Sequence, residues 1–153
     1  MLTLAAWDRL DIVSERALWL LITAASGAEI GPHPAKVRIL DTFMRGQRRP
    51  FKGVTLGGVA LTARGGTIVM SRDKGALRGR ADGAKPIPPL PLAPNQETIW
   101  DGRVALTMAR PGWSVVFEAG SPRLARGEDR AELAAASPRW LLQERLSHLL
   151  ECD

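Results

Sequence analysis

The chain has little of several residue types, and each shortage excludes a class of protein. Its 153 residues include one cysteine, Cys152, which excludes an internal disulfide framework and a cysteine-based zinc site. No apolar run approaches the roughly 18 residues of a membrane-spanning helix, and the longest, residues 17–25, is interrupted by Thr23. Charged side chains occur throughout residues 8–16, which does not fit a signal peptide. We therefore expect a cytoplasmic protein with no membrane partner.

The sequence also lacks the usual signs of catalysis. Neither of the phosphate-cradling motifs G-x-x-x-x-G-K-[ST] and G-x-G-x-x-G occurs. The two histidines lie in different predicted elements: His33 is expected in a turn between prolines, and His148 at the boundary of a helix face. No nucleophile, acid–base pair or metal-ligand set is recognisable. We predict no catalytic residue, no metal site and no cofactor in this chain, so an independent enzyme is the least favoured function.

The aromatic residues are unevenly distributed, with five tryptophans, three phenylalanines and no tyrosine. Three tryptophans fall in predicted helices and are expected in the core: Trp7, Trp19 and Trp140. Trp100 precedes an Asp-Gly turn and Trp113 begins the next predicted strand, so we expect them to pack across a sheet. Phe51 is expected to cover the start of a sheet. For these last three rings, stacking on RNA bases is the alternative.

Positive charge is concentrated in the middle of the chain. The formal net charge is +5, yet residues 36–85 hold twelve cations and three acids, a net +9, which leaves −4 for the rest. This distribution suits a polyanion, and a solvated basic face without a partner is the alternative. Arginine suits phosphate because its planar fork bonds two oxygens. We predict RNA contacts from Arg45, Arg48, Arg49 and Lys52, with a second group of Arg64, Arg72 and Lys74.

Two helices are predicted near the start of the chain. Apolar residues recur at helical spacing over residues 8–26, and Gly27 is a natural stop. Pro34 can open a second helix that Gly46 can terminate. We expect residues 1–50 to form a helical module, the end of a helical bundle.

Residues 51–122 are expected to form an antiparallel β module. Strands are predicted over 54–62, with Gly57 and Gly58 as a bulge or close approach, and over 67–72, joined by a Gly-containing hairpin. Residues 73–97 are predicted to be a long proline-rich loop. Strands follow at 97–100 and 103–108, joined by Asp101-Gly102, and at 113–118.

The remaining residues, 123–153, are expected to form C-terminal helices. An alanine-rich helix is predicted over 128–136, and Pro138 is predicted to open a last helix with a wide leucine stripe. The complete prediction is an α+β fold with helices at both ends and antiparallel hairpins between them, because no crossover helices separate the strands.

Several short motifs resemble one protein family. The segments T-L-G-G-V at 55–59 and W-D-G-R at 100–103, with P-L-A-P at 91–94 and a Pro-containing turn and helix at 32–40, resemble the C-terminal part of bacterial tRNA(Ile)-lysidine synthetases. The likeness covers the first helix to about residue 120, and residues 125–153 match no pattern of that family. Enzymes of this family use ATP to activate the wobble cytidine of an isoleucine tRNA and join it to lysine.

The resemblance implies an accessory role. The family's ATP-binding loop and catalytic residues belong to an N-terminal domain without a counterpart here, so no catalytic residue is carried over, and ATP and lysine would be used by that missing domain. The chain is then part of such an enzyme or a stand-alone relative, with a non-catalytic module that holds tRNA. Its implied partners are tRNA and either the catalytic domain or a second copy. A protein-interaction or dimerisation module without RNA binding is the alternative.

Overall fold

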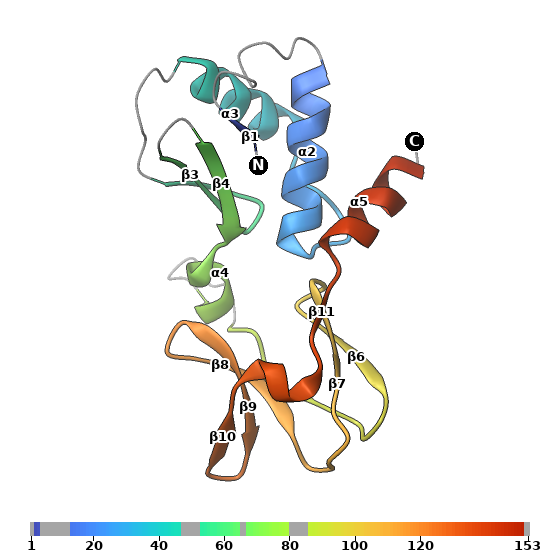
Figure 1. The fold of residues 1–153 in the computed structure, drawn as a ribbon. Coiled ribbons are helices and arrows are strands. Elements are labelled where there is room, and N and C mark those ends of the chain that lie inside the picture. Colours follow the sequence, from blue (N-terminus) through green and yellow to red (C-terminus); the bar gives the residue numbers. More distant parts are fainter. Residues whose placement is uncertain (1, 4–12, 47–52, 65–66, 80–85, 152–153) are drawn as a thin grey trace. The chain divides into compact units, whose positions relative to one another are not determined.

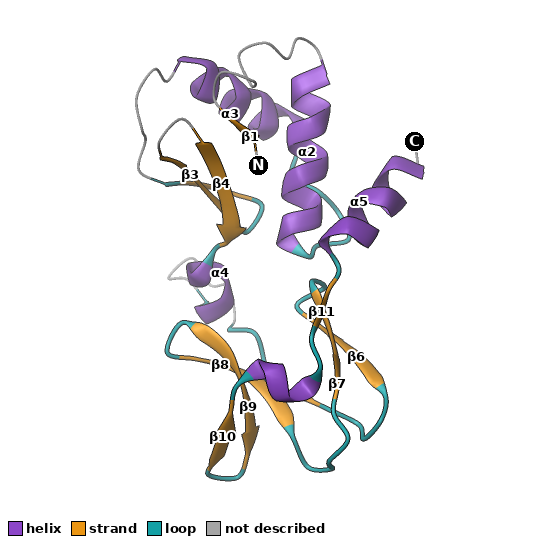
Figure 2. Ribbon diagram, viewed as in Figure 1, coloured by secondary structure: helices purple, strands orange, loops and turns teal. Residues whose placement is uncertain are grey.

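A computed structural model describes residues 2–3, 13–46, 53–64, 67–79 and 86–151 of the chain (Figure 1). The fold is α+β, with helices toward both ends and antiparallel hairpins between them, as the sequence predicts (Figure 2). None of the helices in these ranges is long and apolar enough to cross a membrane. The chain divides into two compact units, one of residues 1–73 with 144–153 and the other of residues 74–143. These differ from the three modules expected from the sequence, because the helical pair shares a core with the first hairpins.

The first unit packs two helices against a four-stranded antiparallel sheet. Its helices are α2 (Val13–Ser26) and α3 (Pro34–Gly46), and its sheet has the order β1-β4-β3-β2. The strands are β1 (Leu2–Thr3), β2 (Val54–Leu56), β3 (Val59–Arg64) and β4 (Thr67–Arg72). Both predicted helices are confirmed over these ranges, and residues 8–12 of the first prediction lie outside the described part. His33 directly precedes α3, and its carbonyl accepts hydrogen bonds from the amides of Lys36 and Val37 in the first turn of that helix.

Every second residue of β3 faces the core between the sheet and the two helices. Val59, Leu61 and Ala63 are buried while the residues between them are partly exposed, the period of two expected of a half-buried strand. They pack with apolar residues of both helices and of β4: Leu18, Ile22, Val37, Leu40, Met44 and Ile68. The predicted single strand over 54–62 is wrong, because Leu56 pairs with Val59 and the two glycines form a hairpin turn. Their φ angles of 56° and 75° are left-handed, which glycine adopts without steric cost.

Helix α5 (Leu142–Glu151) follows the second unit and belongs mainly to the first. It begins later than predicted, because Arg139 and Trp140 pair with a strand instead. Arg145 reaches the end of α2, where its Nη2 donates to the carbonyl oxygens of Thr23 and Ala28. A cation at this position satisfies carbonyls that the end of a helix leaves unpaired.

The second unit contains two small antiparallel sheets around one core. One has the order β10-β9-β8-β5 and the other β11-β7-β6. The strands are β5 (Leu90–Pro91), β6 (Glu97–Trp100), β7 (Val104–Thr107), β8 (Ser114–Glu118), β9 (Ser121–Arg126), β10 (Asp129–Ala131) and β11 (Arg139–Trp140). The core is formed by Leu77, Leu92, Trp100, Val104, Leu106, Met108, Trp113, Val115, Leu124 and Ala136.

Three predictions for this unit need correction. The long loop expected over 73–97 contains the short helix α4 (Lys74–Arg78) and strand β5. These elements form because Leu77 and Leu92 are buried in the core of the second unit. The alanine-rich helix expected over 128–136 is strand β10 followed by a 3-10 turn at Leu133–Ala136, because residues 129–131 pair with β9. The sequence predicts that Trp140 lies in a helix and packs in the core, but it lies in β11 and is 60% exposed.

Candidate nucleic-acid interface

Arg45 of the predicted RNA-binding cluster lies within the last turn of α3 rather than beyond its end. Its Nε lies 2.9 Å from Oδ2 of Asp41, one helical turn earlier, and Asp41 is buried. The guanidinium is partly exposed, so it can reach a ligand only while it also compensates a buried carboxylate. Arg48, Arg49 and Lys52 fall in residues 47–52, outside the described part of the chain.

Arg64 and Arg72 of the second group stand at opposite ends of the β3–β4 hairpin. Arg64 pairs with Thr67 beside the connection, and Arg72 pairs with Val59 at the other end. Thr67 and Arg72 are five positions apart along β4, about 17 Å at the usual rise per residue. The side chain of Arg64 lies outside the described part. Arg72 is held at its own end, since its Nη1 donates to the carbonyl oxygen of Gly58 at 2.8 Å.

Lys74, the last residue of the second group, lies in the second unit beside a residue that the sequence prediction omitted. Lys74 and Arg78 are the first and last residues of α4, four apart and therefore on one face. Both side chains are exposed. They extend over the turn between β8 and β9: a Cβ built on Gly120 would lie 2.9 Å from Nη2 of Arg78 and 3.8 Å from Nζ of Lys74. We call Lys74 and Arg78 the α4 cation pair.

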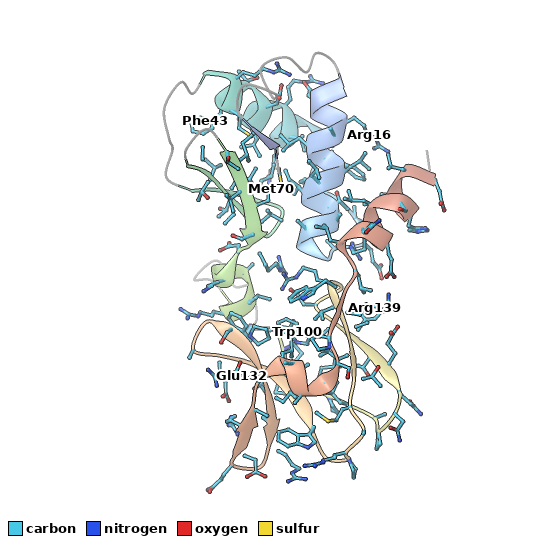
Figure 3. All side chains as sticks on the ribbon, viewed as in Figure 1. Arg16, Phe43, Met70, Trp100, Glu132 and Arg139 are labelled. Atoms are coloured by element: carbon cyan, nitrogen blue, oxygen red, sulfur yellow. The ribbon has the colours of Figure 1, made fainter. Side chains whose placement is uncertain are left out.

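Most other arginines in the described part of the second unit are paired with acids. Four of these ion pairs have N–O distances of 2.9–3.1 Å: Arg123–Glu132, Arg126–Asp129, Arg130–Glu118 and Arg139–Glu97. Glu132 and Arg139 are labelled in Figure 3. Within the described ranges, by contrast, no ion pair joins either member of the α4 cation pair to an acid. The pair therefore presents uncompensated positive charge on this unit.

The W-D-G-R segment forms a rigid turn with its charges directed inward. Asp101 and Gly102 have φ angles of 52° and 61°, and Nε of Arg103 lies 2.7 Å from Oδ2 of Asp101. The guanidinium of Arg103 also lies 6.0 Å from the ring centre of Trp100. Both charged side chains are largely buried. Arg103 is therefore a structural residue of the turn.

The tryptophans next to this turn are not available for stacking on bases. Trp100, labelled in Figure 3, is 1% exposed and Trp113 is 8% exposed, and both belong to the core of the second unit. They flank different sheets rather than pairing across one. The Nε1 atoms of both rings are buried without a hydrogen-bond partner among the described residues. Phe51 lies outside the described part.

A groove on the first unit was not predicted from the sequence. It has a volume of about 720 Å³ and is lined by Glu15, Arg16, Trp19, Ile30, Gly31, Pro32, His33, Pro34 and Val37. Trp19 was expected in the core, but it is half-buried and donates from Nε1 to the carbonyl of Pro32 at 2.9 Å. Arg16, labelled in Figure 3, lies 4.8 Å from the centre of that ring. Helical spacing alone assigns Trp19 to a packed face and gives no sign of the loop at 30–33 that leaves it accessible.

Glu118 and Arg130 form an exposed ion pair in which each side chain shifts the pKa of the other. The hydrogen bonds from Arg130 hold the pKa of the Glu118 carboxyl below its ordinary value, and Glu118 in turn raises the pKa of Arg130. In the described ranges no three histidine, cysteine, aspartate or glutamate side chains gather to hold a metal ion. Comparisons with protein families, curated proteins and solved structures found no match.

Proposed function

We propose that this chain is a non-catalytic, cytoplasmic module that binds tRNA, resembling the C-terminal part of a tRNA(Ile)-lysidine synthetase. In such an enzyme it would hold the isoleucine tRNA while a separate catalytic domain uses ATP and lysine. The single observation that carries the proposal is the net +9 charge of residues 36–85. An excess of cations of this kind gives the long-range attraction and the phosphate contacts that RNA binding requires.

The arrangement of the motif residues supports this proposal. The glycines of T-L-G-G-V form a two-residue turn against which Arg72 is placed, and W-D-G-R forms a turn with an internal ion pair. Both are rigid turns in small antiparallel sheets, and a rigid scaffold lowers the entropy lost when surface cations are ordered on a ligand. The side chains of the motifs stabilise the scaffold, which leaves phosphate contacts to cations elsewhere.

A salt titration with the whole chain tests the proposal. Fluorescently labelled tRNA(Ile) is bound at several salt concentrations, and log Kd is plotted against log salt. We expect Kd to rise steeply with salt, because each neutralised phosphate releases bound counterions. A polyglutamate chain of similar charge serves as the control for unspecific attraction. No binding, or binding that ignores salt, would contradict the proposal.

Helix α5 favours one alternative, a protein-interaction or dimerisation module. Leu142 and Leu150 are 48% and 62% exposed, and none of the described residues of this helix is buried. An apolar stripe of this kind is typical of a surface covered by another protein. Light scattering after size-exclusion chromatography distinguishes the two functions: a stable dimer that binds no tRNA supports the alternative, and a monomer that binds tRNA supports the proposal above.

A further inference from the structure

We propose that the α4 cation pair and the Ala119–Gly120 turn form a second phosphate-binding site, on the second unit, for the backbone of the bound tRNA. The inference rests on the proposed RNA-binding function and extends it to a place that the family motifs do not include. It is carried by the geometry of Lys74 and Arg78, by their lack of acidic partners within the described ranges, and by the exposed surface that they share.

The site is fixed in place by the core beneath it. Leu77, between the two cations in sequence, is 4% exposed and belongs to the core of the second unit. Its carbonyl accepts a hydrogen bond of 3.0 Å from the amide of Ile87. A five-residue helix has little stability by itself, so these two anchors set the direction of its charged face. The two cations therefore project from a defined position rather than from a free loop.

The Ala119–Gly120 turn has a shape that lets the side chains of Lys74 and Arg78 approach its backbone. Glu118 pairs with Ser121, so Ala119 and Gly120 are the two central residues of the hairpin turn, with φ angles of 50° and 83°. Gly120 is buried and has no side chain, and a Cβ there would meet the guanidinium of Arg78. The missing side chain lets the guanidinium and the ammonium of Lys74 lie close to the same point of the backbone.

The electrostatics favour an anion between the two side chains. Like charges four residues apart on a helix repel each other, and an anion bound by both relieves that repulsion. The acid nearest in sequence to the turn is Glu118, and both of its carboxylate oxygens are bonded to Arg130, at 2.9 and 3.1 Å. The negative charge of Glu118 is therefore already compensated by Arg130 of β10. A phosphate group can accept from both the ammonium and the forked guanidinium.

The test compares two double variants of the whole chain in the tRNA titration. Lys74→Ala/Arg78→Ala removes the proposed site, and Arg110→Ala/Arg126→Ala removes the same charge from the opposite end of the β8–β9 hairpin. We expect the first to raise Kd by about tenfold or more and to lower the log–log salt slope by about two. The control variant Arg110→Ala/Arg126→Ala should change the Kd and the salt slope much less. The charge-preserving exchange Lys74→Arg/Arg78→Lys should retain most of the affinity, which separates charge from local folding.

Each outcome has a definite meaning. If the unmodified chain binds no tRNA, the proposed function and this inference both fail. If the chain binds tRNA but Lys74→Ala/Arg78→Ala behaves like the control double variant, the inference alone is wrong. If the α4 variant loses affinity for polyglutamate but not for tRNA, the site binds acidic protein segments and the inference is again overturned.

Discussion

The guanidinium of Arg72 occupies the space above Gly58 that a Cβ would fill in any other residue. Its Nη1 donates to the carbonyl oxygen of Gly58 at 2.8 Å, and a Cβ built on Gly58 would overlap that same nitrogen. Gly58 also has a φ of 75°. The turn of the T-L-G-G-V motif and a cation fourteen residues later are therefore one structural unit, which explains a glycine pair where a strand alone would need none.

Replacing Gly58 by alanine should destabilise the first unit by about 1–3 kcal/mol. The change combines the cost of a left-handed conformation with the displacement of Arg72 from its hydrogen bond. Chemical denaturation followed by circular dichroism measures the effect. Gly53→Ala is the matched control, because a Cβ there would make only ordinary contacts at 3.6 Å or more and its φ is not left-handed. Equal stability of the two variants would contradict the role of Arg72 and of the turn.

Leu61→Ala should reduce the free energy of unfolding by about 2–5 kcal/mol, the usual cost of a cavity left by a leucine. Leu61 is fully buried at the centre of β3, among residues of both helices. Val69→Ala on the adjacent strand is the control, since Val69 is 46% exposed and should lose much less. Comparable losses in urea denaturation would mean that the core of this unit lies elsewhere.

The Glu118–Arg130 pair should make stability depend on pH in acid. The folded-state pKa of Glu118 is held below its ordinary 4.5 by the hydrogen bonds from Arg130. A depressed carboxyl pKa stabilises the folded state above the ordinary value, and this contribution is lost as the pH falls through the folded-state value. Denaturation midpoints of the wild type and of Glu118→Gln should therefore converge as the pH drops below 4.5. Glu128→Gln, which removes another acid of the same hairpin region, controls for net charge, and a constant difference between wild type and Glu118→Gln at all pH values would refute the assignment.

Replacing Arg48 and Arg49 together by alanine should weaken tRNA binding by about 1–3 kcal/mol, if each makes a charge-assisted phosphate contact. It should also flatten the salt dependence. Arg126→Ala/Arg139→Ala is the charge-matched control, because these two arginines are paired with Asp129 and Glu97. Unchanged affinity in a folded Arg48/Arg49 variant would remove these residues from the site.

Local patterns were sufficient to predict the two helices α2 and α3 and one hairpin turn. Pro34 and Gly46 bound α3 as predicted, because a proline without an amide donor and a glycine free in φ mark helix ends in any context. The Asp101-Gly102 turn is confirmed for a similar reason. The failures occur where a short apolar segment has no preference of its own. Residues 128–136 contain alanines that favour a helix, but the partner strand β9 converts residues 129–131 to β10.

The candidate site was predictable in charge but not in position. A count of cations along the chain shows a basic middle, yet it cannot separate Arg45, which compensates buried Asp41, from Lys74, which has no acidic partner among the described residues. The place of Arg78 cannot be predicted from the sequence, because the Ala119–Gly120 turn beneath its side chain lies about forty residues away and becomes a neighbour only after folding.

The sequence by itself determined the α+β class, the first two helices, the Asp101-Gly102 turn and the excess of positive charge. These features depend on backbone preferences and composition, which act locally and need no partner. Only the tertiary structure decided which strands share a sheet, which tryptophans are buried and which cations remain uncompensated. Those properties depend on contacts between segments far apart in the chain, and such contacts form only where burial of apolar surface outweighs the entropy lost in bringing the segments together.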